Sequence, residues 1–201
     1  MKTIAINGGT GELGHAVLPR LLRDARCIVL YRDEPSWLRL RDAIRDGDMI
    51  GVANVNEIAE DVDAIVNLAG AFTLGASPDD FSRMLDANLL SAVKTIDGVR
   101  LRDGGRIIAI SSIASLAKPA GLGAYVASKA ALNAYLEVLA KELAPRKITV
   151  NALAPSTLDT ATMRKASPNE PRVPLDRVAE TIAFLLSDAA GSVSGQIIAM
   201  R

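Results

Sequence analysis

The chain has 201 residues, of which 49% are hydrophobic, and its 23 basic and 23 acidic side chains cancel. This length suits one domain with a sizeable core, and the zero net charge gives no electrostatic basis for general nucleic-acid binding. Cys27 is the only cysteine, so no internal disulfide can form, and its apolar surroundings indicate a core residue. No apolar run approaches the ~20 residues that span a bilayer, and the first residues show no signal-peptide pattern. We therefore expect a cytoplasmic protein without membrane or nucleic-acid partners.

The chain opens with a strand, a glycine-rich turn and a helix. Residues 2–7 form an apolar strand, and the helix should run to Leu22. The turn carries glycines in the spacing Gly-x-x-Gly-x-x-Gly, and its candidate ligand-binding residues are Gly8, Thr10, Gly11, Glu12, Leu13 and Gly14. Glycine permits a tight turn and lets the backbone approach a pyrophosphate, which then meets the positive end of the helix. The segment predicts a dinucleotide site, and the alternative is a glycine-rich turn without a ligand.

The second strand, from Cys27 to Tyr31, should decide which dinucleotide binds. An acidic residue at its end would bind the ribose hydroxyls of NAD, whereas an arginine suits the 2′-phosphate of NADP. Tyr31 stands at the usual acidic position and Arg32 follows it, which favours NADP. Asp33 and Glu34 would bind the hydroxyls if the register were shifted by one or two residues, so NAD stays possible. The other alternative for Arg32 is a solvent-exposed ion pair with one of these carboxylates.

The rest of the chain alternates strands and helices. We expect strands at residues 48–52, 63–67, 106–111, 148–153 and 195–200, and helices at residues 124–144 and 175–186. Another helix should begin at Pro78, with a core stripe of Phe81, Leu85, Leu89, Ala92 and Ile96. Residues 162–174 are polar and broken by prolines, so they should form a loop. The alternation predicts an α/β fold, a single Rossmann-type domain with a doubly wound parallel sheet of about seven strands and helices on both faces.

A candidate proton-transfer site lies between Ser112 and Lys129. Tyr125 and Lys129 share one face of the expected helix, and Ser112 follows the strand at residues 106–111, thirteen residues before Tyr125. A phenol ionises near pH ~10, and a neighbouring ammonium should lower that pKa, which would make Tyr125 a proton donor and acceptor. The alternative is a tyrosine and a lysine on a solvated helix face.

Ser112, Tyr125 and Lys129 at this spacing resemble the catalytic set of the short-chain dehydrogenase/reductase family. The segment Asn67-Leu-Ala69-Gly70 is similar to the family's Asn-Asn-Ala-Gly motif. The glycine spacing departs from the usual Thr-Gly-x-x-x-Gly-x-Gly and is similar to that of the sugar-nucleotide-modifying and atypical branches. The resemblance covers nearly the whole chain and is weakest at residues 31–60 and 156–201, where the substrate loop is shortened.

The resemblance implies roles for further residues. Asn88 would hold a water that links Lys129 to solvent, although a helix asparagine satisfied by its neighbours is the alternative. Lys129 would also bind the nicotinamide ribose beside Tyr125. The remaining cofactor contacts would come from Asn54, Val55, Asn67, Ala69, Gly70, Pro155, Ser156 and Thr160.

The resemblance implies an NADP-dependent oxidoreductase that transfers hydride between nicotinamide and a small carbonyl or alcohol, with Tyr125 as general acid and base and no metal. The second hypothesis is a cofactor-binding regulator or scaffold, suggested by the shortened loop, by Ser156 in place of glycine and by the missing C-terminal Asp-Gly-Gly. A sugar-nucleotide epimerase or dehydratase is a third, for which the chain is short. By analogy with relatives that pair through two long helices, we expect a homodimer or homotetramer. An apolar pocket wall, or simple packing, is expected from Phe72, Leu74, Ile113, Leu116 and Leu122.

Overall fold

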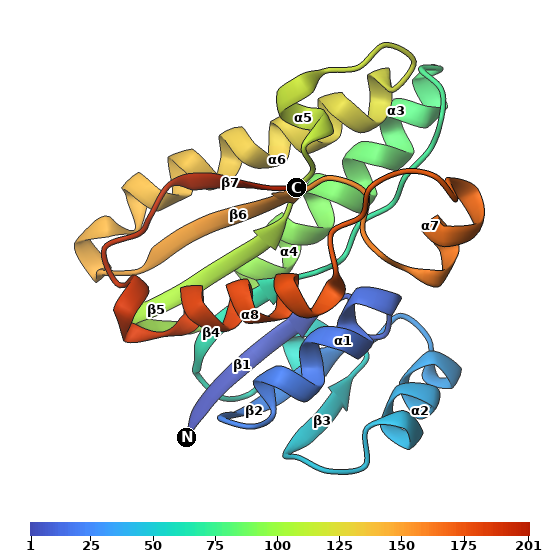
Figure 1. Ribbon diagram of the computed structural model, residues 1–201. Coiled ribbons are helices and arrows are strands. Elements are labelled where there is room, and N and C mark those ends of the chain that lie inside the picture. Colours follow the sequence, from blue (N-terminus) through green and yellow to red (C-terminus); the bar gives the residue numbers. More distant parts are fainter.

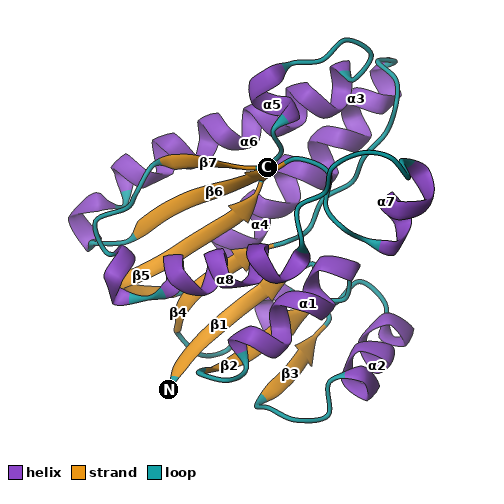
Figure 2. Ribbon diagram, in the orientation of Figure 1, coloured by secondary structure: helices purple, strands orange, loops and turns teal.

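The computed structural model describes all residues from Met1 to Arg201. Seven parallel strands form one sheet in the order β3-β2-β1-β4-β5-β6-β7. Figures 1 and 2 show helices on both faces of this sheet, which confirms the predicted Rossmann-type architecture. The strands are β1 (Lys2–Asn7), β2 (Ala25–Leu30), β3 (Met49–Val52), β4 (Val62–Asn67), β5 (Leu101–Ile110), β6 (Thr149–Pro155) and β7 (Gln196–Met200).

Two hydrophobic layers hold the helices to the sheet, because successive side chains of each strand point to opposite faces. Ile4 and Ile6 join the layer under α1 (Glu12–Leu21), α2 (Glu34–Ala43) and α8 (Leu175–Leu186), whereas Ala5 joins the layer under α4 (Ser91–Gly98) and α6 (Gly123–Glu142). Cys27 is fully buried in the first layer, and this burial raises the pKa of its thiol to about 12. None of the helices is long and apolar enough to cross a membrane.

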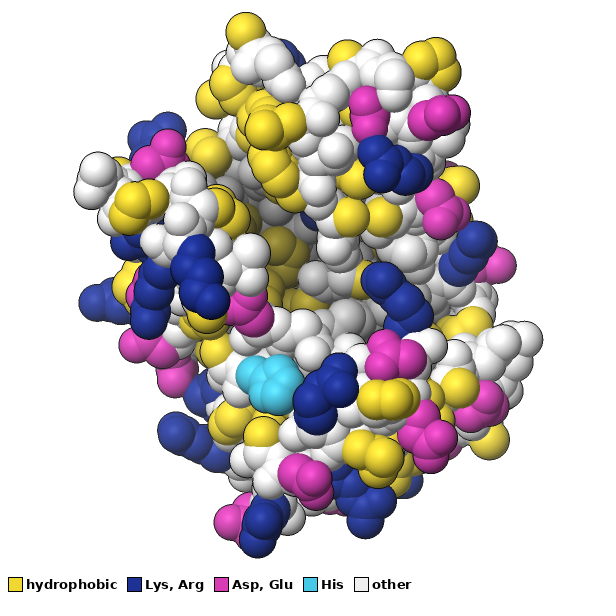
Figure 3. Space-filling view, turned by 90° about the vertical axis from the view of Figure 1, so that its right-hand side faces the viewer, with side chains coloured by type: hydrophobic (Ala, Val, Ile, Leu, Met, Phe, Trp, Pro, Cys, Tyr) yellow, Lys and Arg dark blue, Asp and Glu magenta, His cyan; other side chains and the backbone are white.

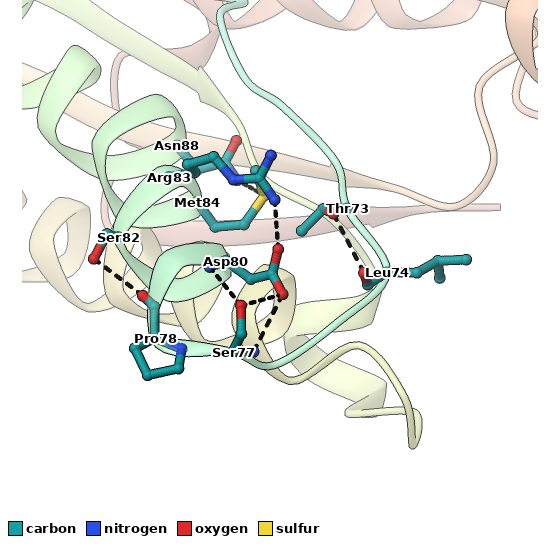
Figure 4. Close-up of polar contacts among 9 residues, drawn as sticks. All are labelled: Thr73, Leu74, Ser77, Pro78, Asp80, Ser82, Arg83, Met84 and Asn88. Atoms are coloured by element: carbon teal, nitrogen blue, oxygen red, sulfur yellow. Dashed lines mark hydrogen bonds and ion pairs between the residues drawn. The ribbon is translucent and has the colours of Figure 1, made fainter.

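The helix expected from Pro78 differs from the prediction in its buried face. It is interrupted between α3 (Pro78–Leu85) and α4 by a π-helical turn, Asp86–Leu90. The extra residue in this turn shifts the register, so the fully buried positions are Met84, Asn88, Ala92 and Thr95. Of the predicted core stripe only Ala92 is fully buried, and its other four members are half-buried. Figure 4 shows the start of α3, where a capping box formed by Ser77 and Asp80 closes the first turn.

Most boundaries lie within two residues of the predictions, but two segments differ by more. The segment 162–174 is a loop, as predicted, only from residue 167 onward. The short helix α7 (Ala161–Ala166) covers its first five residues, and Thr160 caps this helix by accepting a hydrogen bond from the Met163 amide at 3.1 Å. β5 begins at Leu101 rather than at residue 106, since an irregularity in its pairing with β4 lets the strand continue through two glycines.

The strand order creates a crevice at the carboxyl edge of the sheet. After β1 the chain crosses to β2 on one side, whereas β4 pairs with β1 on the other side, so β1 and β4 form the topological switch point at which ligands bind in such sheets. Figure 3 looks onto this edge and shows it hollowed between two lobes of the surface, with hydrophobic side chains along the upper border.

Candidate active site

The glycine turn after β1 is built to lie against the end of β4. Gly8 has a φ of +80°, and a Cβ there would fall 2.4 Å from the Ala69 nitrogen, so only glycine fits. A Cβ on Gly14 would fall 2.0 Å from the Gly9 oxygen, which shows how closely α1 packs on the turn. Gly11 is the N-cap of α1 and offers no side chain to cap it. The first amides of α1 therefore face an open glycine cradle, and this geometry fits the pyrophosphate of a dinucleotide.

A buried amide network joins the ends of β1 and β4. The Asn7 Nδ2 donates to Asn67 Oδ1 at 2.8 Å and to Thr95 Oγ1 at 3.0 Å, and the Thr95 hydroxyl donates to the Ser91 carbonyl at 2.9 Å. Asn67 is fully buried, so its side chain supports the crevice from behind rather than lining it. Ala69 and Gly70, which follow it, form the floor of the crevice beside the glycine turn.

Arg32, which follows β2, is a cationic side chain without an ion-pair partner. Asp33 accepts hydrogen bonds from the Ser36 hydroxyl at 2.5 Å and the Ser36 amide at 2.9 Å, which cap α2 and lower the pKa of its carboxyl group. Arg32 is exposed and forms no ion pair, so the structure does not contain the expected alternative of a surface pair. Tyr31 stacks on Trp37 with ring centroids 5.9 Å apart, which fixes the exit of the strand.

Ser112 and Tyr125 converge above the end of β5. The Ser112 backbone is anchored because its carbonyl accepts hydrogen bonds from Ser115 Oγ at 2.6 Å and the Ser115 amide at 3.0 Å. Burial raises the pKa of the Tyr125 phenol, and a hydrogen bond with the Ser112 hydroxyl partly opposes that shift. The expectation that Lys129 lowers this pKa is wrong, because the loss of water around the phenol dominates.

Lys129 is a buried amine beneath the crevice. Only 4% of the residue is exposed, and its Nζ donates to the Ile110 carbonyl at 2.8 Å. Burial lowers its pKa from 10.5 to about 8, so the ammonium still predominates at neutral pH. A Cβ on Gly70 would fall 3.0 Å from this Nζ, so the chain after β4 runs close to the amine, and a larger residue there would displace it. The structure thus brings together Gly70, Ser112, Tyr125 and Lys129, and Lys129 does not lie on a solvated face.

Asn88 is satisfied by the chain around it. Its Oδ1 accepts from the Ala71 amide at 2.8 Å, and its Nδ2 donates to the Ala71 carbonyl at 3.0 Å and to Ser128 Oγ at 2.9 Å. The Ser128 hydroxyl donates in turn to the Tyr125 carbonyl at 2.8 Å. Figure 4 shows Asn88 beside Met84, one turn after α3. Sequence reasoning missed Ser128, although the need of a buried amide for partners and the position of Ser128 between Tyr125 and Lys129 were available signals.

The remaining residues predicted to contact the cofactor mostly form structural contacts within the chain. The Leu13 side chain is buried in the core, so only its backbone faces the crevice. Asn54 caps a short turn by accepting from the Asn56 amide at 2.9 Å, and Val55 packs against Gly98. The Pro155 carbonyl accepts from the Ile113 amide at 3.0 Å, and the Ser156 amide donates to the Met200 carbonyl at 2.9 Å. Thr160 caps α7, and Thr10 is half-buried in the glycine turn.

An apolar rim borders the phenol. The rings of Phe72 and Tyr125 meet edge to face with centroids 5.0 Å apart. Phe72, Leu74 and Leu116 are 57%, 72% and 44% exposed, which is high for large hydrophobic side chains. Exposed apolar groups that gather beside polar ones commonly mark a binding surface. The arrangement can therefore hold an apolar molecule against the Tyr125 phenol. No cluster of three or more His, Cys, Asp or Glu residues is placed to bind a metal ion.

Comparisons with known proteins agree on one family. A family model described as enoyl-(acyl carrier protein) reductase matches residues 50–200. The 3-oxoacyl-(acyl-carrier-protein) reductase FabG of Rickettsia felis is 30% identical, over 98% of this chain and 94% of that protein. The 3alpha-hydroxysteroid dehydrogenase of Mediterraneibacter gnavus is 28% identical, over 99% of this chain and 95% of that protein.

Solved structures give the same result. A short-chain dehydrogenase/reductase family oxidoreductase from Burkholderia thailandensis superimposes with a TM-score of 0.88 and 25% identity, over 98% of this chain and 90% of that one. A short-chain dehydrogenase/reductase from Serratia marcescens superimposes with a TM-score of 0.87 and 25% identity, over 99% of this chain and 96% of that one. The chain therefore belongs to the short-chain dehydrogenase/reductase family and is an oxidoreductase enzyme of that family.

Proposed function

We propose that this protein is an NADP-dependent oxidoreductase that interconverts a small carbonyl compound and its alcohol, with Tyr125 as general acid and base. The observation that carries the proposal is the convergence of the Ser112 hydroxyl, the Tyr125 phenol and the buried Lys129 amine beside Gly70, at the mouth of the glycine cradle. A nicotinamide bound there would supply or accept the hydride.

The three side chains have separate roles in this proposal. Ser112 donates a hydrogen bond to the carbonyl oxygen, on which negative charge develops. Tyr125 is protonated at neutral pH, because burial raises its pKa, and it donates that proton to the same oxygen. Lys129 lies where the nicotinamide ribose would pass over Gly70, and its ammonium would donate a hydrogen bond to that ribose.

Asn88 supports the proton relay by holding the backbone on two sides of the phenol. Both of its amide hydrogens are engaged, one by the Ala71 carbonyl and one by Ser128. The side-chain amide nitrogen of Asn88 therefore has no hydrogen left to donate to a relay water, and a water in the relay would bind another atom of this residue. The Ser128 hydroxyl accepts a hydrogen bond from Asn88 and donates one to the Tyr125 carbonyl, so it links Asn88 to the backbone of Tyr125.

The preference for NADP rests on the end of β2. Arg32 carries an unpaired positive charge there, whereas the Asp33 carboxylate is occupied by the cap of α2. We expect NADP to raise the melting temperature more than NAD does at equal concentration, since a ligand of the folded state stabilises it. Arg32→Glu should abolish that difference, whereas Arg41→Glu, the same charge change on the exposed side of α2, should leave it intact. An equal shift with both cofactors in the unsubstituted protein would argue against NADP.

The apolar rim supports a substrate with an apolar substituent next to its carbonyl group. Phe72, Leu74 and Leu116 would cover that substituent while its oxygen meets Ser112 and Tyr125. The test is NADPH consumption over a panel of carbonyl compounds, with NADPH binding measured separately. Consumption with apolar ketones or aldehydes supports the proposal. NADPH binding without consumption on any compound would instead support the cofactor-binding regulator.

A further inference from the structure

The glycine turn carries one acidic side chain, Glu12, which leaves the turn and reaches a distant segment. Glu12 is the first residue of α1, and its carboxylate accepts hydrogen bonds from the Ala161 amide at 2.6 Å and the Thr162 amide at 3.4 Å. It also accepts one from the Thr162 hydroxyl. These donors hold the pKa of Glu12 below its ordinary value, with Lys165 adding a weaker attraction. The segment Ala161–Ala166 is α7, far from Glu12 in sequence.

Little else fastens α7 to the protein. None of its residues is buried, and Figure 1 shows it standing apart from the other helices, at the side of the sheet where the strands end. Its other hydrogen bonds remain within its own loop: Thr160 caps its start, and Arg164 pairs with Asp159 through two contacts of 2.7 Å. The Glu12 carboxylate is thus the only hydrogen-bonding group outside that loop that holds α7 in place.

The strand order shows what the Glu12–α7 contact spans. Glu12 follows β1 and α7 follows β6, and the order β1-β4-β5-β6 places the ends of β4 and β5 between them. Gly70 lies beyond the end of β4, and Ser112 lies beyond the end of β5. The contact therefore bridges the crevice above the residues to which the cofactor and the carbonyl oxygen are assigned.

We propose that Glu12 is a positioning residue whose carboxylate fastens α7 across the crevice, so that a bound dinucleotide is enclosed beneath the bridge and leaves only when the bridge opens. The ligand in this inference rests on the proposed function, but the bridge itself does not. The arrangement also explains how a carboxylate is accommodated next to a pyrophosphate site, since its charge is directed to the α7 amides. It further fixes Thr160, which immediately precedes α7, over the crevice.

The test compares Glu12→Gln and Thr162→Val, alone and combined, with Arg164→Gln as a control that breaks only a contact within the loop. The NADPH dissociation rate is measured by stopped-flow displacement, following the fluorescence of the nucleotide. Because exposed charge-assisted hydrogen bonds contribute modestly, we expect Glu12→Gln to raise the rate about fivefold and Thr162→Val about threefold. Because glutamine keeps an acceptor oxygen, the double variant should be faster than Glu12→Gln alone but slower than the product of the two single effects, and Arg164→Gln should match the unsubstituted protein. Unchanged or slower dissociation in Glu12→Gln, or independent effects of the two substitutions, would overturn the proposal.

A second measurement does not depend on the cofactor. Hydrogen exchange of the Ala161 and Thr162 amides is followed in the protein without nucleotide. Exchange should be faster in Glu12→Gln than in the unsubstituted protein, with α1 itself unaffected. If NADPH does not bind at all, the proposed function fails while this measurement still reports on the bridge. Equal exchange in the two proteins would overturn the bridge whatever the cofactor does.

Discussion

Replacement of Lys129 by methionine should make the fold more stable while it removes activity. The fall in the pKa of Lys129 from 10.5 to about 8 corresponds to about 3 kcal/mol by which the folded state disfavours the ammonium. Methionine is apolar and of similar length, so it removes this cost, but it also removes the hydrogen bond to the Ile110 carbonyl, worth about 1 kcal/mol. The net stabilisation at pH 7 should be about 2 kcal/mol, or roughly 4–8 °C in melting temperature for a chain of this size.

The pH dependence makes the origin of this stabilisation visible. Between pH 8 and 10.5 the unfolded chain keeps the Lys129 proton while the folded state has released it, so the stability contributed by this residue rises with pH in that window. The advantage of Lys129→Met should therefore be greatest below pH 8 and disappear near pH 10. Urea unfolding of both proteins without cofactor, at several pH values, measures this difference. Lys141→Met, at an exposed position of the same helix, should have almost no effect. A variant that is less stable at pH 7, by an amount that does not change with pH, would refute the reasoning.

Three further predictions follow from the packing. Gly70→Ala places a Cβ 2.8 Å from Asn88 Oδ1 and 3.0 Å from Lys129 Nζ, so turnover should fall at least about tenfold, and a steady-state assay with undiminished kcat would contradict this. The Cys27 thiol, fully buried and with a pKa raised to about 12, should resist a thiol reagent at pH 8 until urea unfolds the chain, and rapid labelling of the folded protein would show that the core is open. Val138→Glu, on the exposed side of α6, should convert the expected homodimer or homotetramer to a smaller species in light scattering, whereas an unchanged mass would exclude this helix from the interface.

The sheet was predictable because strand-length apolar runs alternate with helical patterns. Residues 175–186 were assigned to their helix without error, since the apolar period there is regular. The helix from Pro78 was predicted at the correct place but with the wrong buried face. Its π-helical turn contains Asn88, whose partners Ala71 and Ser128 are distant in sequence and have no local pattern.

The site could be predicted as a set of residues, but its electrostatics could not. Spacing placed Tyr125 and Lys129 on one helix face, and strand ends placed Ser112 and Gly70 near them. The pKa of the phenol depends on how much water surrounds it, and neither that burial nor the contact with the Phe72 ring can be read from the spacing. The role of Glu12 was likewise hidden, because its partners lie in a segment expected to be an unstructured loop. The relatives found in the comparisons are named as reductases and dehydrogenases, which also weighs against the sugar-nucleotide hypothesis.

The central claim is that the Tyr125 phenol donates the proton in the reaction, and Tyr125→Phe tests it most directly. The substitution removes one oxygen atom and keeps the ring that packs edge to face against Phe72. NADPH consumption and NADPH affinity are measured on the same preparation, with the carbonyl compound that the unsubstituted protein reduces fastest. The account predicts that consumption is lost while the affinity for NADPH changes little. Consumption at the rate of the unsubstituted protein would contradict it.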